Sequence, residues 1–256
     1  MAPLRVEALI LRNLRLGDTS RIVTVLSREL GKWSGVAKGG RDPKGRFGAS
    51  LEIMSISTLV VYFRAGRDLQ TISEGSLERE FRGLLSTSER YHHGCAVLEF
   101  LDRVLEEGSP VPEVYDLSVR VLALMEEVPE GRPSYLLRAF QLRTAGWLGY
   151  APRLERCVIC GAQEVCHFGM AEGGLLCRDC GGRCSGAIPL GAGTMQLLRS
   201  LCAGSLPRNP SRDACRELER VAEGFLSYHL ERYRGLRSLR ALSEVGRLRQ
   251  RPTATR

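Results

Sequence analysis

Two C-x-x-C pairs constrain this chain more strongly than any other feature. The first pair is Cys157 and Cys160, and the second, sixteen residues further on, is Cys177 and Cys180. Each pair presents two sulfurs on the same side of a tight turn, so the four thiolates can meet around one tetrahedral Zn²⁺. Because four cysteines leave no ligand position for water, we predict a structural zinc site here and not a catalytic one.

Other roles for these cysteines stay open at this stage. C-x-x-C also serves thiol exchange, so a redox or disulfide role is the alternative to metal binding. Cys166, His167 and Cys184 lie within or beside the two pairs, and any of them could replace one ligand. The chain has no apolar run of eighteen residues and no charged-then-apolar leader, so we expect a soluble protein of the reducing cytoplasm, without membrane partners.

The beginning of the chain has the pattern of strands. Short β-branched runs separated by turn residues predict five strands, at residues 6–11, 21–26, 32–37, 51–64 and 69–73. Five short strands with a Gly-rich loop after the third fit a small closed barrel of the OB type, although periodicity alone does not exclude an SH3-like barrel.

After residue 78 the pattern changes to helices. Apolar residues at three- and four-residue intervals predict helices at 88–107, 113–127, 134–148, 194–202, 211–233 and 236–247. We therefore predict an α+β multidomain chain. It has a five-stranded OB-fold β-barrel over residues 1–80, followed by an α-helical domain over residues 81–256 with a four-cysteine zinc module inserted at about 154–188.

The charge distribution indicates a polyanionic partner. The net charge is +8, and all three lysines of the chain fall in one stretch that also carries two arginines and a single acid, Asp42. Glycines let this stretch follow a phosphate chain, and aromatic residues at its ends offer stacking surfaces, which suits single-stranded nucleic acid. The predicted contacts are Lys32, Trp33, Lys38, Arg41, Lys44 and Arg46, with Phe47 as a further ring.

Two alternatives accompany this nucleic-acid interpretation. The first is that the basic stretch is a solvated loop whose two aromatic residues lie in the core. A second basic concentration near the end of the chain includes Arg237 and Arg240, which lie three apart on one helical face. We predict these two arginines as further phosphate contacts, with a solvated helix face as the alternative.

The sequence offers little to a catalytic interpretation. There is no G-x-x-x-x-G-K-[ST], no H-E-x-x-H and no G-x-S-x-G, and the four histidines accompany no obvious nucleophile or acid cluster. A metallohydrolase would need an open zinc position, which four cysteines deny. We therefore predict a protein that is not an enzyme.

Several longer segments together identify a family. They read E-A-L-I-L-R from Glu7, G-D-T-S-R-I-V-T-V-L-S-R-E-L-G from Gly17, G-V-A-K-G-G-R from Gly35, R-F-G-A-S-L from Arg46, F-Q-L-R-T-A-G-W-L-G-Y-A-P from Phe140, C-V-I-C-G from Cys157 and F-L-S-Y-H-L-E-R-Y-R-G-L-R-S-L from Phe225. In order and spacing these segments resemble the bacterial DNA repair protein RecO family of recombination mediators.

The resemblance implies an N-terminal OB domain, a helical C-terminal domain and, in members that keep the cysteines, a zinc module. It also implies binding of single- and double-stranded DNA, and annealing of complementary strands without ATP. The implied protein partners are RecR, the acidic tail of single-stranded DNA-binding protein and, indirectly, RecA, at the nucleoid. The alternatives that the residues leave open are a zinc-ribbon transcription or translation factor that binds RNA or duplex DNA, and a structural adaptor for an acidic peptide.

Overall fold

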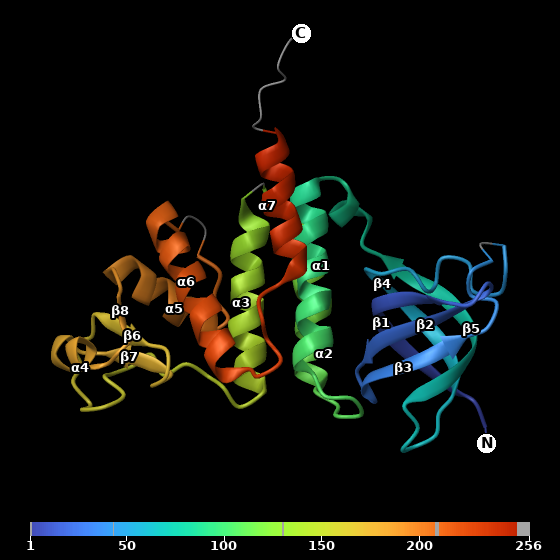
Figure 1. Ribbon diagram of the computed structural model, residues 1–256, viewed down its shortest axis with the longest axis horizontal. Helices are drawn as coiled ribbons and strands as arrows, with labels where there is room; N and C mark the ends of the chain where they lie inside the picture. The colour runs from blue at the N-terminus through green and yellow to red at the C-terminus, as the bar shows by residue number, and fades with distance from the viewer. Residues whose placement is uncertain (1, 43, 130, 208–209, 250–256) are drawn as a thin grey trace, which may run out of the picture. The chain divides into compact units, whose positions relative to one another are not determined.

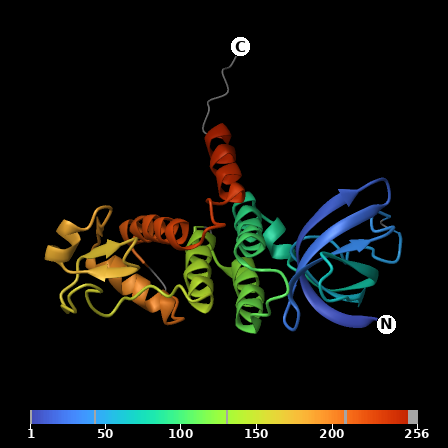
Figure 2. The ribbon, with the colours of Figure 1, turned by 60° about the horizontal axis from the view of Figure 1, so that its bottom comes forward.

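The computed structural model describes residues 2–42, 44–129, 131–207 and 210–249. These residues form a five-stranded barrel, a set of helices and a small sheet that carries the cysteines (Figure 1; Figure 2). They divide into two compact units, one within Met1–Pro133 and Leu236–Arg256, the other within Ser134–Gly235. The predicted domain boundary at residue 80 stays a prediction. No helix among the described residues has the length and apolar content needed to cross a membrane.

The first unit contains the barrel. Its strands run in the order β1-β2-β3-β5-β4 and close on themselves, with β3 and β5 parallel and the other neighbours antiparallel. This confirms the predicted five-stranded barrel and has the OB-type arrangement. The strands are β1 (Leu4–Leu16), β2 (Ser20–Ser27), β3 (Gly31–Ala37), β4 (Ser55–Tyr62) and β5 (Leu69–Glu80).

The segment between β3 and β4 closes one end of the barrel. Residues 45–52 form successive turns, in which Gly48 N–H donates to the Gly45 carbonyl at 3.1 Å and Ser50 N–H to the Phe47 carbonyl at 2.9 Å. These turns place Phe47 and Leu51 in the barrel core. The prediction that the fourth strand begins at residue 51 is therefore wrong, because Leu51 and Ile53 pack into the barrel core and the strand begins only at Ser55.

Strand β5 continues to Glu80, seven residues beyond the predicted end. The charged residues of its second half look like loop sequence, but β4 pairs with them along most of its length. Gly75 lies so close to Ser50 that a side chain at this position would collide with it. The long strand thus requires a glycine where it passes the turns that close the barrel. This requirement comes from residues distant in the sequence and not from the local pattern.

Four helices accompany the barrel in the first unit, namely η1 (Arg82–Leu85), α1 (Ser88–Val104), α2 (Pro112–Glu127) and α7 (Arg237–Arg249). The Thr87 side chain caps α1 by accepting from the Arg90 N–H at 3.2 Å. Strand β3 is tied to the end of α1, because Lys32 Nζ donates to the Asp102 carbonyl. The Lys32 carbonyl accepts in turn from Gly108 N–H at 2.8 Å.

The second unit holds three longer helices and the cysteine module. These elements are α3 (Arg132–Trp147), β6 (His167–Gly169), β7 (Gly174–Leu176), α4 (Arg178–Arg183), β8 (Ile188–Pro189), α5 (Ala192–Cys202) and α6 (Arg212–His229). Buried Arg138 on α3 pairs with Glu219 at 2.9 Å and Glu223 at 3.2 Å on α6. Because a buried guanidinium without carboxylates is costly, this pairing joins α3 to α6 in one arrangement.

Candidate metal centre and nucleic-acid interface

The four predicted ligands lie together in the cysteine module. The sulfur atoms of Cys157, Cys160, Cys177 and Cys180 are all within 4.8 Å of one another, and those of Cys160 and Cys177 are 3.6 Å apart. Tetrahedral Zn²⁺ with bonds of about 2.3 Å requires sulfur atoms roughly 3.8 Å apart. The cluster can therefore hold one metal ion in a closed, four-thiolate shell.

Local backbone structure builds the cluster. In the first pair, Gly161 N–H donates to the Cys157 carbonyl at 2.9 Å, and Gly161 has a φ of 77°, a conformation that glycine adopts at little cost. In the second pair, Cys177 is the N-cap of α4, and its sulfur accepts from Cys180 N–H at 3.5 Å. A knuckle turn and a short helix thus present the sulfurs from two sides.

Burial and hydrogen bonding shift the pKa values of the cluster's thiols in opposite directions. Cys157 and Cys180 are buried, whereas Cys160 is exposed. Burial raises the pKa of the Cys180 thiol to about 12. Burial would also raise the pKa of the Cys157 thiol. Hydrogen bonds from backbone N–H groups, the strongest from Cys160, outweigh burial and lower that pKa to about 6. Metal ligands bind as thiolates, so metal binding at this cluster would release the protons of its thiols.

The neighbouring residues Cys166, His167 and Cys184 are not part of the cluster. Among the described residues, only the four predicted cysteines have ligand atoms close enough together for a metal. The His167 ring instead occupies the space beside Gly181, where a Cβ would collide with it. Its Nδ1 lies 3.2 Å from the Cys166 sulfur. Gly181 is therefore needed to make room for the imidazole.

The second candidate site is the basic loop between β3 and β4. Arg41, Asp42 and the backbone around Gly45 line a hollow of about 680 Å³ together with Asp18 and Thr19 from the β1–β2 turn. Lys38 and Arg46 also line this hollow, and exposed Lys44 lies on the same loop. Three of the six residues predicted in this stretch, Lys38, Arg41 and Arg46, thus line one hollow at the end of the barrel where β1 ends and β2 begins.

Two arginines shape this loop while keeping donors for a ligand. Arg41 Nη1 donates to the carbonyls of Gly17 at 3.0 Å and Asp18 at 2.7 Å, which fastens the loop to the β1–β2 turn. Arg46 Nη2 donates to the Lys38 carbonyl at 3.1 Å, and its guanidinium lies 5.3 Å from the Phe47 ring centre. Both guanidinium groups are held by backbone oxygens, so their positive charges are not neutralised by these contacts.

Lys32 and Trp33 lie elsewhere, which corrects the expectation that they contact a nucleic acid. Trp33 is 3% exposed in the barrel core, where its Nε1 donates to Ser27 Oγ at 3.2 Å. Lys32 is 4% exposed and holds α1. Phe47 is buried as well, so none of the three side chains is available to a base or a phosphate. Strand alternation did not reveal this, because every residue of β3 except Val36 is buried.

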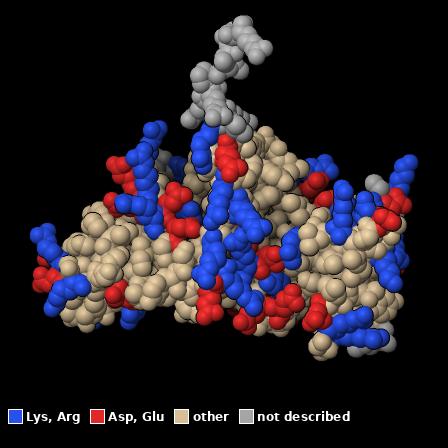
Figure 3. All heavy atoms as spheres, viewed as in Figure 1, with Lys and Arg blue, Asp and Glu red and all other residues tan. Residues whose placement is uncertain are grey.

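Arg237 and Arg240 lie on the first turns of α7 with exposed side chains. Figure 3 shows Lys and Arg side chains along α7 in the middle of the view, with few acidic ones between them. The N-terminus of α7 contacts Glu99 of α1. The Glu99 carboxylate accepts hydrogen bonds from the backbone N–H groups of Arg237 and Ser238, both at 3.0 Å. Burial alone would raise the pKa of Glu99, but these hydrogen bonds and nearby Arg103 lower it.

Sequence reasoning missed the second wall of the basic hollow. Asp18 and Thr19 were expected only as turn residues, and Arg15 was not considered. The antiparallel register places exposed Arg15 opposite Arg21, next to that turn. No local signal marks these residues, because only barrel closure brings the β1–β2 turn against the loop that follows β3.

Comparison with known proteins agrees with this architecture. Family models described as "Recombination protein O N terminal" and "Recombination protein O C terminal" match residues 1–81 and 85–240. The DNA repair protein RecO of Anaeromyxobacter dehalogenans (strain 2CP-C) is 33% identical over 255 residues, covering 97% of this chain and 99% of the relative. That of Streptomyces griseus subsp. griseus is 35% identical over 253 residues, covering 94% and 98%. That of Rubrobacter xylanophilus is 34% identical over 234 residues, covering 90% and 93%. The chain therefore belongs to the RecO family of DNA repair proteins.

Proposed function

We propose that this protein is a recombination mediator that binds single- and double-stranded DNA and anneals complementary strands without ATP. The observation that carries the proposal is the cluster of cations at one end of the barrel, in a chain that matches the family over most of its length. Lys38, Arg41 and Arg46 line the hollow together with Asp18 and Asp42, and exposed Lys44 lies on the same loop, so cations outnumber acids there. Such a surface neutralises phosphates without reading base edges.

Annealing needs positive charge on more than one surface, because two polyanions must approach each other. The loop after β3 would hold one strand, while Arg237 and Arg240 of α7, or a second copy of the chain, would hold the other. Phosphate neutralisation releases counterions from both strands and so lowers the cost of bringing them together. The protein would act by binding alone, without catalytic turnover.

We propose further that the ion of the four-cysteine cluster is Zn²⁺ and that its role is structural. The sulfur–sulfur distance of 3.6 Å and the all-cysteine ligand set support this assignment. The metal would hold together a module whose strands are only two or three residues long and whose buried core is small. In the cell the protein would work in the cytoplasm at the nucleoid, with RecR, with the acidic tail of single-stranded DNA-binding protein and, through them, in loading RecA.

The experiment that tests the proposal is annealing of two complementary oligonucleotides, each coated with its cognate single-stranded DNA-binding protein. Annealing is followed by fluorescence without ATP, with the coated strands alone as the control. We expect the protein to accelerate annealing several-fold. Tight binding to bare strands with no acceleration would contradict the mediator function and would favour a zinc-ribbon factor with a preferred nucleic acid.

A further inference from the structure

The second unit carries a row of aromatic rings that neither the metal cluster nor the barrel explains. His229, at the end of α6, contacts both Tyr150 and Tyr228, with ring centres 6.0 Å and 5.0 Å from its own, and these three rings make up the row. Tyr228 is 61% exposed and Tyr150 is 43% exposed. Rings with this much exposure contribute little to a core, so packing alone gives no reason for the two tyrosines.

The centre of the row is held rigidly. His229 Nε2 donates to the carbonyl of Met170 at 2.9 Å, which fixes the proton on that nitrogen because a carbonyl can only accept. The ring centre of Phe225 lies 4.6 Å from that of the His229 imidazole. Phe168 contacts Phe225 edge-on, with ring centres 6.0 Å apart. A buried aromatic pair thus supports an exposed one, so the exposed rings are presented on a firm base.

Positive charge lies next to the row. A Cβ added at Gly173 would lie 3.4 Å from His229 Nε2, so this turn is next to the His229 ring. Arg153 holds the same turn, donating from Nη2 to the Glu172 carbonyl at 3.0 Å and from its N–H to the Gly173 carbonyl at 3.0 Å. Arg156 follows three residues later. Both arginines are exposed, and neither takes part in an ion pair among the residues that the structure describes.

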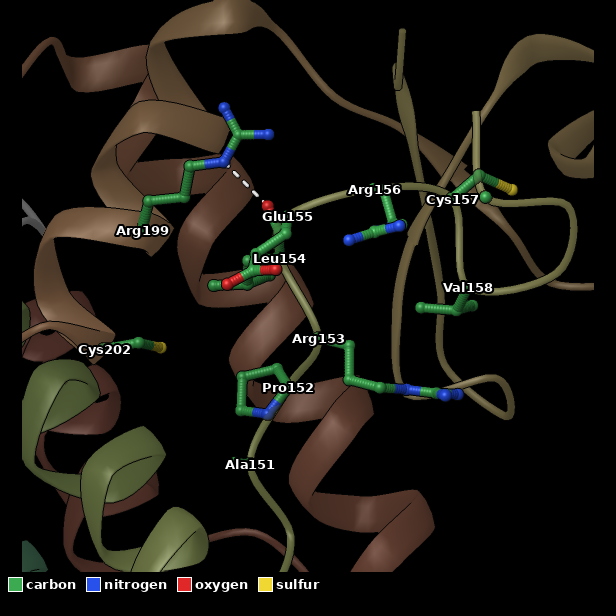
Figure 4. Close-up of a pocket in the computed structure, with 11 residues that line it drawn as sticks. Ala151, Pro152, Arg153, Leu154, Glu155, Arg156, Cys157, Val158, Arg199 and Cys202 are labelled. Atoms are coloured by element: carbon green, nitrogen blue, oxygen red, sulfur yellow. Dashed lines mark hydrogen bonds between the residues drawn. The ribbon is translucent and has the colours of Figure 1, made fainter. Parts of the chain in front are cut away.

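A hollow of about 740 Å³ continues from this charge (Figure 4). It is lined by the segment from Ala151 to Val158, which follows Tyr150 directly, and by Arg199 and Cys202 of α5. Figure 4 shows Arg153 and Arg156 extending from this segment, while Arg199 reaches back to the Leu154 carbonyl at 2.7 Å. Among these lining residues Glu155 carries the opposing charge.

We infer that this surface of the second unit binds unpaired nucleotides, with Tyr150 and Tyr228 stacking on bases and Arg153 and Arg156 contacting phosphates. Exposed flat rings beside unpaired arginines are the combination that single-stranded nucleic acids use, since every base has a π-face and every nucleotide a charge. The two tyrosines are exposed and lie outside the residues that line the neighbouring hollow, so their ring faces are open to a base.

This inference rests on the proposed function and adds a separate stacking surface to it. The barrel loop offers exposed positive charges, but the neighbouring rings of Trp33 and Phe47 are buried. It can therefore contact the phosphate backbone of a nucleic acid but cannot stack on a base. The tyrosine row offers both, and it selects single strands, because the bases of a duplex are already stacked on one another. With one surface of each kind, the protein can hold the unpaired bases of one strand on the tyrosine row while the barrel loop binds the phosphate backbone of a second strand.

The test compares a thymidine oligonucleotide with an abasic oligonucleotide of equal length and equal charge, using the full-length protein and fluorescence anisotropy. We expect wild type to prefer the oligonucleotide with bases. Tyr150→Leu with Tyr228→Leu should weaken its binding by roughly 5- to 150-fold per stacked base and remove the preference, because leucine is apolar but has no π-face. Tyr150→Phe with Tyr228→Phe should keep the preference.

Tyr91→Leu is the matched control, because Tyr91 is a 38%-exposed tyrosine on α1 outside the row, and it should leave the preference unchanged. Equal preference in wild type and the double leucine variant would overturn the stacking surface. Equal wild-type binding of the two oligonucleotides, with a strong salt dependence, would overturn it too while leaving the proposed DNA-binding function intact. Absence of binding to either oligonucleotide would overturn both. Loss of affinity for an acidic peptide alone would assign the row to a protein partner and reject the inference.

Discussion

Removing two charges from the loop after β3 should lower the salt dependence of DNA binding by a definite amount. The perturbation is Lys38→Gln with Lys44→Gln. Both side chains are exposed, and neither ammonium group takes part in a hydrogen bond or ion pair among the described residues. Arg41 is left in place because its guanidinium fastens the loop to the carbonyls of Gly17 and Asp18, so its loss would also disturb the fold.

The magnitude follows from counterion release. Each neutralised phosphate contributes roughly 0.7 to the slope of log K against log salt for single strands, and roughly 0.9 for duplex DNA. Two lost contacts should therefore reduce the slope by about 1.4 for single strands and by about 1.8 for duplex DNA. Between 50 and 200 mM salt, wild type should lose about sevenfold more affinity for single strands than the variant does.

The assay is fluorescence anisotropy with a labelled oligonucleotide at four or more salt concentrations. The matched control is Arg64→Gln with Arg67→Gln, which removes the same net charge from exposed positions on the β4–β5 connection, at the opposite end of the barrel. We expect the control to keep the wild-type slope. If the lysine variant has the wild-type slope, the loop makes no phosphate contact through these residues and the reasoning is refuted.

Three further predictions concern stability. Cys157→Ala should lower zinc content and melting temperature together, because metal binding and folding of the module are coupled, whereas the control Cys184→Ser should keep one zinc ion per chain; a Cys157→Ala chain that keeps its metal would contradict the ligand set. Burial alone would raise the pKa of Glu99, but hydrogen bonds from the start of α7 lower that pKa. The Glu99 carboxylate therefore stabilises α7 fully above the unfolded pKa of about 4.3, and this stabilisation is lost as pH falls through the lower folded pKa. Hydrogen-exchange protection of α7 should therefore fall on acidification in wild type and be low already at neutral pH in Glu99→Gln, and equal protection of the two at pH 7 would argue against this. Gly31→Ala should lower the melting temperature, since Gly31 has a φ of 67° and a Cβ there would collide with the Ser109 backbone, at a cost of at least about 1 kcal/mol; an unchanged melting temperature would count against that close approach.

The parts of the fold that rest on local patterns were predictable. The helices from residue 88 onward lie within a few residues of their predicted bounds, because amphipathic spacing and caps are encoded within single turns. The five barrel strands were recognised, but several of their ends were not, and the three short strands of the cysteine module were not predicted. Leu51 and Ile53 look like strand residues but pack into the barrel core, and residues 74–80 look like loop but pair with β4. In both cases a partner far along the chain decided the outcome.

The same division runs through the candidate sites. Four cysteines at metal-ligand spacing specify their own cluster, because two short motifs need only one turn each to present their sulfurs. The charge of the loop after β3 was also evident, but whether a side chain faces solvent was not, and Trp33, Lys32 and Phe47 proved to be buried.

By itself, then, the sequence determined the types of the longer elements, the four-cysteine cluster and the positions of positive charge, since each depends on neighbours within a few residues. Only the tertiary structure decided which aromatic rings are exposed. Trp33 and Tyr228 are both aromatic residues near arginine or lysine, yet one is 3% exposed and the other 61%. Exposure is set by packing against elements distant in sequence, and a local pattern carries no information about those elements.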